Sequence, residues 1–341
     1  MNKINWGIIG LGNIAQSFSE GFYGVKNSNL LAISSLNKLK IDKFKSKFKI
    51  DNKYVFNDYE KLINCKEVDI VYIALPNSYH YKWILKCIEN NKRILVEKPA
   101  FQNFNEAQKI KKRIKENELF FSEGFMYRYH PQINKILKII NNNEIGELMS
   151  MESSFGLNLL TKKKLFFFNK KKKINPKNRL FNKELGGGCI LDLGCYPSSF
   201  SLLIASQLKK INYNNFQITN VKKEIGETGV EIDSEAELKF ENNFNSKIKA
   251  SFKKDLGSSS VIYGSKGSIL INDTWNGDGI SKIIGKKTFK YEKNNIKNIF
   301  SYEIESISQK ILDGINDSSF SGINLDETIL NSKILEDWLN A

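Results

Sequence analysis

A glycine turn between a strand and a helix most constrains the fold of this chain. Residues 4–9 are apolar and rich in β-forming side chains, and residues 14–23 have the pattern of a helix. The turn between them reads Gly10-Leu11-Gly12-Asn13-Ile14-Ala15. Small residues at its first, third and sixth positions predict the start of a βαβ unit.

Each small residue of this turn has a physical role. Gly10 allows a tight turn, Gly12 lets the backbone approach a pyrophosphate, and Ala15 keeps the helix close to the sheet. The N-terminus of the helix offers free N–H groups and a positive dipole end to phosphates. The predicted dinucleotide site therefore comprises Gly10, Gly12, Asn13, Ile14 and Ala15. A plain tight turn is the simpler alternative.

Alternating strand and helix patterns continue to residue 123. Further strands are expected at 29–35, 68–75, 93–96 and 119–123, and helices at 40–48, 58–63, 79–89 and 105–115. The strands are continuously apolar, which is typical of a parallel sheet covered on both faces. The sequence therefore predicts an α/β fold, with a doubly wound Rossmann domain for dinucleotide binding over residues 1–123.

The pattern changes in the second part of the chain. We expect helices at 131–141, 196–208, 301–312 and 325–339, and an alternating strand at 147–157. Between 216 and 271, apolar and polar residues alternate as in antiparallel strands with one solvated or partner-covered face. Residues 124–341 are therefore predicted to form an α+β domain with a large, mostly antiparallel sheet, for substrate binding and oligomerisation.

Composition excludes several classes of protein. No apolar run approaches the roughly 20 residues of a membrane helix. The N-terminus enters a strand directly, so we expect no signal peptide, no membrane partner and a cytoplasmic protein. The four cysteines contain no C-x-x-C pair and there are two histidines. We therefore expect no metal site and reduced, buried thiols.

The net charge of +15 raises the question of nucleic-acid binding. Lysines cluster at 162–164 and 170–173 around three phenylalanines. No nucleic-acid-binding signature accompanies this cluster, so a solvated loop and no nucleic-acid partner are expected. A basic field can also attract phosphorylated ligands.

The end of the second predicted strand bears on cofactor choice. An NAD site usually has an acidic residue there, which binds the ribose 2′-hydroxyl. No acidic residue occurs between Glu20 and Asp42, and the strand ends near Ser35 and Lys38. A hydroxyl and a cation suit a 2′-phosphate, so the sequence favours NADP, with NAD as the alternative. The simpler interpretation of Ser35 and Lys38 is a solvated turn.

A second motif, Val96-Glu97-Lys98-Pro99, ends a buried strand. Parallel sheets bind ligands at the carboxyl ends of their strands. A lysine at a strand end is usually solvated, but Lys98 lies between Glu97 and Pro99 after an apolar run. This arrangement favours a functional lysine.

These motifs, with three later segments, resemble the Gfo/Idh/MocA oxidoreductases, the glucose-fructose oxidoreductase family. The later segments are 124–132 (GFMYRYHPQ), Arg179-Leu180, and the triple glycine 186–188 leading to 191–197 (LDLGCYP). The resemblance covers essentially the whole chain. It is closest to the branch of dihydrodiol dehydrogenase, glucose-fructose oxidoreductase and NADP-dependent aldose 1-dehydrogenases.

The resemblance implies hydride transfer between a nicotinamide cofactor and a sugar, sugar derivative or related diol. The positions that match the family's catalytic groups are Lys98, Asp192 and Tyr196. A nearby ammonium lowers the high pKa of a tyrosine and makes it a better base. We therefore predict Tyr196 as acid–base, Lys98 as its electrostatic partner and Asp192 as a substrate ligand on the same helix face. The roles of Lys98 and Tyr196 can be exchanged.

Further site residues follow from the resemblance. The predicted cofactor site also includes Leu75, Pro76, Asn77, His80, Glu97 and Lys98. His80 is expected over the nicotinamide edge, with a packed surface histidine as the alternative. Tyr127 and Arg179 are predicted to contact substrate, although Arg179 fits a solvated loop equally well. A cis Lys98–Pro99 bond is also implied.

The resemblance also implies an assembly. A broad antiparallel sheet with one apolar face generally needs a partner, and in this family that face forms a dimer, so a homodimer or homotetramer through strands of 216–271 is expected. Two alternative functions stay open: a dehydrogenase of nucleotide-linked sugars in glycan synthesis, and a catalytically weak NADP-binding sensor or assembly protein. Loops at 155–185 and 253–285 are expected to set substrate specificity.

Overall fold

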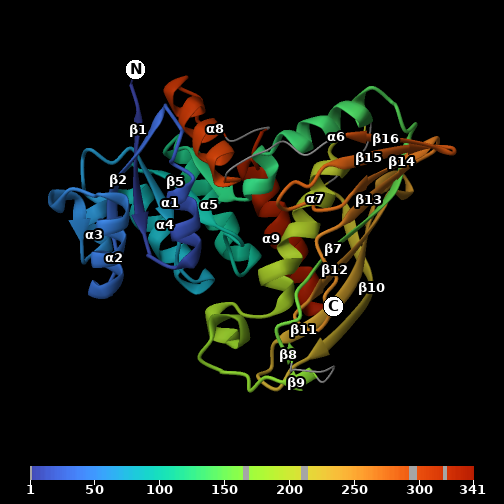
Figure 1. Cartoon of the computed structure of the whole chain (residues 1–341), viewed down its shortest axis with the longest axis horizontal. Coiled ribbons are helices and arrows are strands. Elements are labelled where there is room, and N and C mark those ends of the chain that lie inside the picture. Colours follow the sequence, from blue (N-terminus) through green and yellow to red (C-terminus); the bar gives the residue numbers. More distant parts are fainter. Residues whose placement is uncertain (1, 164–168, 209–213, 292–297, 318–320) are drawn as a thin grey trace. The chain divides into compact units, whose positions relative to one another are not determined.

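The chain folds into two units, each built on its own β-sheet (Figure 1). The computed structural model describes residues 2–163, 169–208, 214–291, 298–317 and 321–341. The first unit comprises Met1–His130 and Ile296–Ile329, and the second comprises Pro131–Asn295 and Leu330–Ala341. Residues 164–168 of the basic cluster lie outside the described residues.

The first unit contains a six-stranded parallel sheet in the order β3-β2-β1-β4-β5-β6. Its strands are β1 (Ile4–Ile9), β2 (Ser28–Ser34), β3 (Val55–Phe56), β4 (Ile70–Ile73), β5 (Arg93–Glu97) and β6 (Phe121–Gly124). This order is that of a dinucleotide-binding Rossmann sheet, with the crevice at the ends of β1 and β4. The predicted fold class is confirmed.

Helices cover both faces of this sheet. One face packs against α1 (Asn13–Glu20), α2 (Lys38–Phe48) and α8 (Phe300–Leu312). The other packs against α3 (Tyr59–Ile63), α4 (His80–Glu89) and α5 (Phe104–Glu116). Successive residues of β4, Tyr72 and Ile73, enter these two different cores. Burial on both faces explains why the strands are continuously apolar.

The first unit extends beyond the predicted boundary at residue 123. It runs to His130 and includes 296–329, where α8 lies beside β1 (Figure 1). The Trp6 indole donates a hydrogen bond to the Ser308 hydroxyl over 2.9 Å, and the rings of Phe18 and Phe300 meet edge to face. Packing between segments so distant in the chain leaves no local pattern, which is why the boundary prediction omitted them.

The second unit contains an eight-stranded sheet in the order β10-β11-β12-β7-β13-β14-β15-β16. Its strands are β7 (Leu148–Gly156), β10 (Phe216–Ile225), β11 (Glu231–Phe240), β12 (Asn245–Ser251), β13 (Ser260–Gly264), β14 (Gly267–Ile271), β15 (Ile280–Ile284) and β16 (Lys287–Tyr291). Only β7 and β12 pair in parallel within this sheet, so the sheet is mostly antiparallel, as predicted. β15 lies in a segment that we expected to be a loop.

Helix α7 (Cys195–Ala205) lies along one face of this sheet, and all its residues are buried (Figure 1). The hydroxyls of Ser201 and Ser246 form a hydrogen bond of 2.5 Å between α7 and β12. At the end of α9 (Leu325–Asn340), Trp338 donates to Ser234 of β11 over 2.9 Å. The stretch Lys183–Ala205 is apolar and long enough to cross a membrane, but its apolar window is wholly buried, as in a core helix.

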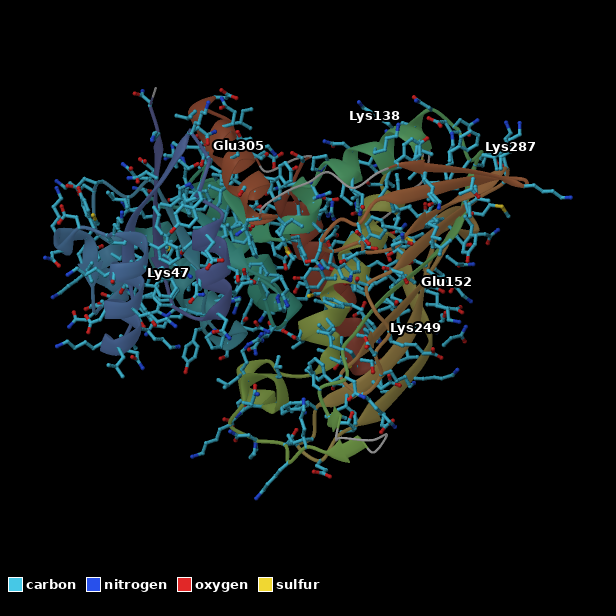
Figure 2. All side chains as sticks on the ribbon, viewed as in Figure 1. Lys47, Lys138, Glu152, Lys249, Lys287 and Glu305 are labelled. Carbon is cyan, nitrogen blue, oxygen red and sulfur yellow. The ribbon has the colours of Figure 1, made fainter. Side chains whose placement is uncertain are left out.

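The opposite face of the sheet carries charged side chains. Glu152, Lys247 and Glu237 are neighbours across β7, β12 and β11. Lys222 forms a 2.8 Å ion pair with Glu235. Figure 2 shows charged side chains over this face, with Glu152 and Lys249 labelled. Alternating charges across strands stabilise the sheet and keep this face polar. The apolar face, which we expected to meet a partner subunit, is instead covered by α7 of the same chain.

Further elements complete the two units. The second unit has α6 (Pro131–Asn141) and a hairpin of β8 (Thr161–Lys163) and β9 (Asn169–Lys171). Cys87, Cys189 and Cys195 are buried and Cys65 is half-buried, and all four are free thiols.

Candidate active site

The glycine turn has the geometry that a pyrophosphate requires. Gly10 has a φ of +89°, and a Cβ there would lie 2.5 Å from the Ala74 carbonyl oxygen. Gly12 precedes α1 in an extended conformation, without a side-chain cap for the helix. Apart from Gly12 and its neighbours in the chain, no described atom lies within 4 Å of a Cβ built on Gly12. The exposed Asn13 and Ile14 and the buried Ala15 then begin α1. This open, uncapped helix N-terminus fits a dinucleotide phosphate.

The end of β2 is polar and lacks an acidic side chain. Ser35 is buried, and its hydroxyl accepts the Asn37 N–H over 3.2 Å. Asn37 in turn caps α2, accepting from the Lys40 amide. Lys38 is exposed in the first turn of α2, which contains no acidic residue. A second helix N-terminus and a lysine therefore flank the position expected for the cofactor ribose.

His80 contacts the backbone directly after two neighbouring strands of the first unit. It begins α4 and is fully buried. Its Nε2 lies 2.8 Å from the Leu75 carbonyl oxygen after β4, and its Nδ1 lies 3.0 Å from the Pro99 carbonyl oxygen after β5. The alternative of a packed surface histidine therefore does not describe it. Asn77 is also buried in the short helical turn that leads to His80.

Lys98 occupies the turn after β5. Its peptide bond to Pro99 is cis, as the resemblance implied. The Lys98 side chain is half-buried, whereas Glu97 is buried and accepts a hydrogen bond from the Tyr72 hydroxyl. The first unit thus holds Lys98 and all the predicted cofactor residues.

Asp192 and Tyr196 lie together in the second unit. A π-helical segment, Ile190–Gly194, runs directly into α7, and both residues are buried. Such π turns often occur at functional sites. A Cβ on Gly194 would lie 2.7 Å from the Trp338 ring, so this glycine lets α9 pack against the segment.

Arg179 contacts Asp192. Its Nη1 donates to the Asp192 carboxylate over 3.0 Å, and about half of the arginine side chain stays exposed. The triple glycine makes this possible: the Gly187 and Gly188 amides donate to carbonyls of the 179–182 turn. A Cβ on Gly187 would lie 2.6 Å from the Arg179 carbonyl oxygen. Arg179 is therefore placed to orient Asp192, and its contact with substrate stays a prediction.

Two aromatic residues that the sequence did not single out surround Tyr196. The Phe155 ring meets it edge to face at 5.2 Å, and the Trp275 ring lies at 5.3 Å between centroids. Trp275 follows β14 in the segment that we expected to contribute specificity loops. In the sequence, the only indication that these two residues belong to the site was the position of Phe155 near the end of an alternating strand.

Tyr127 belongs to a buried network of the first unit. It is fully buried, and its hydroxyl accepts a hydrogen bond from Arg128 Nε over 3.1 Å. The Arg128 guanidinium lies 3.5 Å from the Glu327 carboxylate. The structure therefore places Tyr127 in a polar core, and its contact with substrate stays a prediction.

Comparison with known proteins agrees with this geometry. The model of the oxidoreductase family with an NAD-binding Rossmann fold, GFO_IDH_MocA, matches residues 4–125, and the model of the GFO/IDH/MocA C-terminal domain matches 133–270. Trans-1,2-dihydrobenzene-1,2-diol dehydrogenase of Xenopus tropicalis is 26% identical over 92% of this chain and 91% of that protein.

Two further relatives are informative. D-xylose 1-dehydrogenase (NADP(+)) of Hypocrea jecorina is 28% identical over 57% of this chain and 51% of that protein. The structure of KijD10, a 3-ketoreductase from Actinomadura kijaniata in complex with NADP and TDP-benzene, superposes with a TM-score of 0.82. It is 19% identical and covers 98% of this chain and 96% of its own, so it shows the shared fold. The chain belongs to the Gfo/Idh/MocA family of NAD(P)-dependent oxidoreductases.

Proposed function

We propose that this protein is an NADP-preferring dehydrogenase or reductase that acts on the CH–OH group of a sugar, sugar derivative or related diol. The observation that carries the proposal is the open N-terminus of α1 at Gly12, which fits a dinucleotide phosphate. The xylose dehydrogenase relative uses NADP by its name, and the dihydrodiol dehydrogenase relative acts on a diol by its name.

The preference for NADP rests on the end of β2. Ser35 and Lys38 offer a hydroxyl and a cation there, and the first turn of α2 contains no carboxylate. A carboxylate would repel the 2′-phosphate of NADP and bind the 2′-hydroxyl of NAD. The polar, non-acidic end of β2 therefore supports discrimination in favour of the phosphorylated cofactor.

The chemistry is assigned to residues of both units. When bound, the nicotinamide ring accepts or donates the hydride. We assign proton transfer at the substrate oxygen to Tyr196, with the Lys98 ammonium stabilising its phenolate form. We assign Asp192 as the acceptor of a hydrogen bond from a substrate hydroxyl, a role that its contact with Arg179 supports. This assignment requires Lys98 and Tyr196 to act on the same substrate.

Cofactor titration tests the proposal. NADPH and NADH are added separately to wild type, Ser35→Asp, Lys38→Ala and the matched control Lys40→Ala, and binding is followed by nicotinamide fluorescence. We expect wild type to prefer NADPH, and Ser35→Asp and Lys38→Ala to weaken NADPH binding by about tenfold each, or ~1.4 kcal/mol. Lys40→Ala should bind as wild type does. Absence of binding to either cofactor would refute the enzyme proposal.

A nucleotide-linked sugar is the second substrate class to test. The KijD10 structure, which shares this fold, contains TDP-benzene beside NADP. A screen for substrates should therefore include both free aldoses and diols and, separately, nucleoside-diphosphate sugars. Turnover of only the nucleotide-linked compounds would favour this second function.

We also propose that the protein forms a homodimer or homotetramer through the open face of the second sheet, in the region 216–271. The charged rows of that face fit a polar interface, which salt should weaken. Light scattering at micromolar concentration tests the assembly, and a mass of 39.2 kDa would exclude it.

A further inference from the structure

Glu123 is a buried carboxyl group that neither the motifs nor the proposed chemistry includes. It lies on β6, next to Val96 of β5 in the sheet register, and only 1% of its surface is exposed. Like Val96, it faces the core formed with α5 and Ile329. Glu97 faces the other side, where it meets Tyr72. Burying a charged side chain in such a core costs folding free energy unless hydrogen bonds or an opposite charge compensate it.

The Glu123 carboxyl group holds the backbone of the Lys98 turn. Its Oε1 accepts the Ala100 N–H over 2.9 Å, and Ala100 follows Lys98 and Pro99 directly. Its Oε2 is buried and makes no hydrogen bond of regular geometry with the described residues, although the Thr328 hydroxyl of α9 is close. The carboxyl group therefore has one fixed contact and one oxygen that can carry a proton.

Burial raises the pKa of Glu123 from its ordinary value of 4.5 to about 7. The Ala100 N–H, the Thr328 hydroxyl, and the charges of Arg128 and Lys98 act in the opposite direction and limit this rise. Glu327 partly balances Arg128, with 3.5 Å between their charged groups. On the opposite face of the sheet, burial and the charge of Glu97 raise the pKa of Glu303. Glu123 is thus poised to change charge near neutral pH.

We propose that Glu123 is a positioning residue for Lys98: its carboxyl group holds the Lys98–Pro99–Ala100 turn through the Ala100 amide, and its ionised form stabilises the Lys98 ammonium. The inference rests on the proposed role of Lys98 in proton chemistry. Protonation of Oε2 keeps the hydrogen bond to Ala100 and allows donation to the Thr328 hydroxyl. The turn is therefore kept in both states, while the charge that acts on Lys98 changes.

Three variants separate the two roles of the carboxyl group. Glu123→Gln keeps an oxygen acceptor for Ala100 but cannot ionise. Glu123→Ala removes both the acceptor and the charge. Thr328→Val keeps both, and removes the hydroxyl that lowers the pKa of Glu123.

The first measurement needs no catalytic activity. Because folding raises the pKa of Glu123, the wild type is stabilised below pH 4.5 and loses that contribution as the pH rises to about 7. The free energy of unfolding of wild type relative to Glu123→Gln should therefore fall between pH 5 and pH 8. In Thr328→Val the fall should extend to higher pH. A constant difference across this range would overturn the inference.

The second measurement is the pH profile of kcat/KM with the substrate found by screening. We expect a wild-type inflection near pH 7 that Glu123→Gln lacks, with kcat reduced by roughly tenfold and KM little changed. Glu123→Ala should lower kcat further, because the Ala100 N–H of the turn also loses its hydrogen-bond acceptor. An unchanged profile in Glu123→Gln would show a merely structural role. If Lys98→Met is fully active, the proposed chemistry fails, whereas the unfolding measurement still reports on Glu123.

Discussion

The Lys98 region and the Tyr196 region have opposite surroundings. Around Lys98 the first unit buries several ionisable groups, among them Glu97, Glu123 and Glu303. Around Tyr196 the second unit packs the rings of Phe155 and Trp275. Buried carboxyl groups respond to pH, whereas aromatic packing fixes the position of a side chain. We therefore expect pH dependence to arise in the first region, and the position of the proposed acid–base group Tyr196 to be fixed in the second.

Removal of either central group should have the largest effect. Lys98→Met and Tyr196→Phe should each lower kcat by about 10²–10⁴-fold, because each removes one partner of the proposed proton transfer. Both variants should still bind NADPH, which fluorescence titration would show. Full activity in either variant would break the assignment of chemistry to that region.

The aromatic region should respond next most strongly. Trp275 is 1% exposed, so Trp275→Leu should destabilise the protein by roughly 2–4 kcal/mol, measured by urea unfolding. It should also lower kcat, because the Tyr196 ring loses a contact, without moving the pH profile. Phe289→Leu is the matched control, since Phe289 is 44% exposed on β16. A shifted pH profile in Trp275→Leu would contradict the division between the two regions.

The ionisable region predicts a pH-dependent stability. Burial, with the charge of Glu97, raises the pKa of Glu303, so its folded form holds a proton above pH 4.5 where the unfolded chain releases it. The wild type should therefore lose stability relative to Glu303→Gln as the pH rises above 4.5. Thermal unfolding from pH 4 to pH 8 measures this difference. Parallel curves for the two proteins would show that Glu303 does not titrate in this way.

The ion pair of the second unit should have the smallest effect. Arg179 and Asp192 are 3.0 Å apart, but the Arg179 side chain is 48% exposed, so solvent screens the pair. A double-mutant cycle with Arg179→Ala and Asp192→Asn should give a coupling free energy of unfolding below about 1 kcal/mol. A larger coupling would mean that the pair contributes to the stability of the second unit as well as to the orientation of Asp192.

The local patterns predicted most of the first unit. The glycine turn and the continuous apolar strands lie where the sequence placed them, although β4 ends at Ile73, two residues before the predicted end at 75, and β5 ends at Glu97, one residue after the predicted end at 96. Such signals are local, because a tight turn needs glycine wherever it occurs and a doubly covered strand is apolar along its length. The short strand β3 was missed, since Val55–Phe56 is too brief to show a period.

The contacts around the candidate site could not be predicted in this way. His80 is buried, and its two ring nitrogens lie next to the carbonyl oxygens of Pro99 and Leu75, so the alternative of a surface histidine is wrong. Its expected position over the nicotinamide edge stays a prediction. Arg179 was expected in a loop or on substrate, and it meets Asp192 thirteen positions along the chain. Neither the His80 contacts nor the Arg179–Asp192 pair follows from residue type, because both depend on the conformation of the loops that follow the strands and precede α7.

The sequence by itself determined the family, the Rossmann fold class and the identity of the motif residues, because each of these follows from residue type and spacing. Only the tertiary structure decided that α8 joins the first unit, that Trp275 contacts Tyr196, and that Glu123 holds the Lys98 turn. These features join segments far apart in the chain. Burial, which raises the pKa of Glu123, exists only once those segments have packed together.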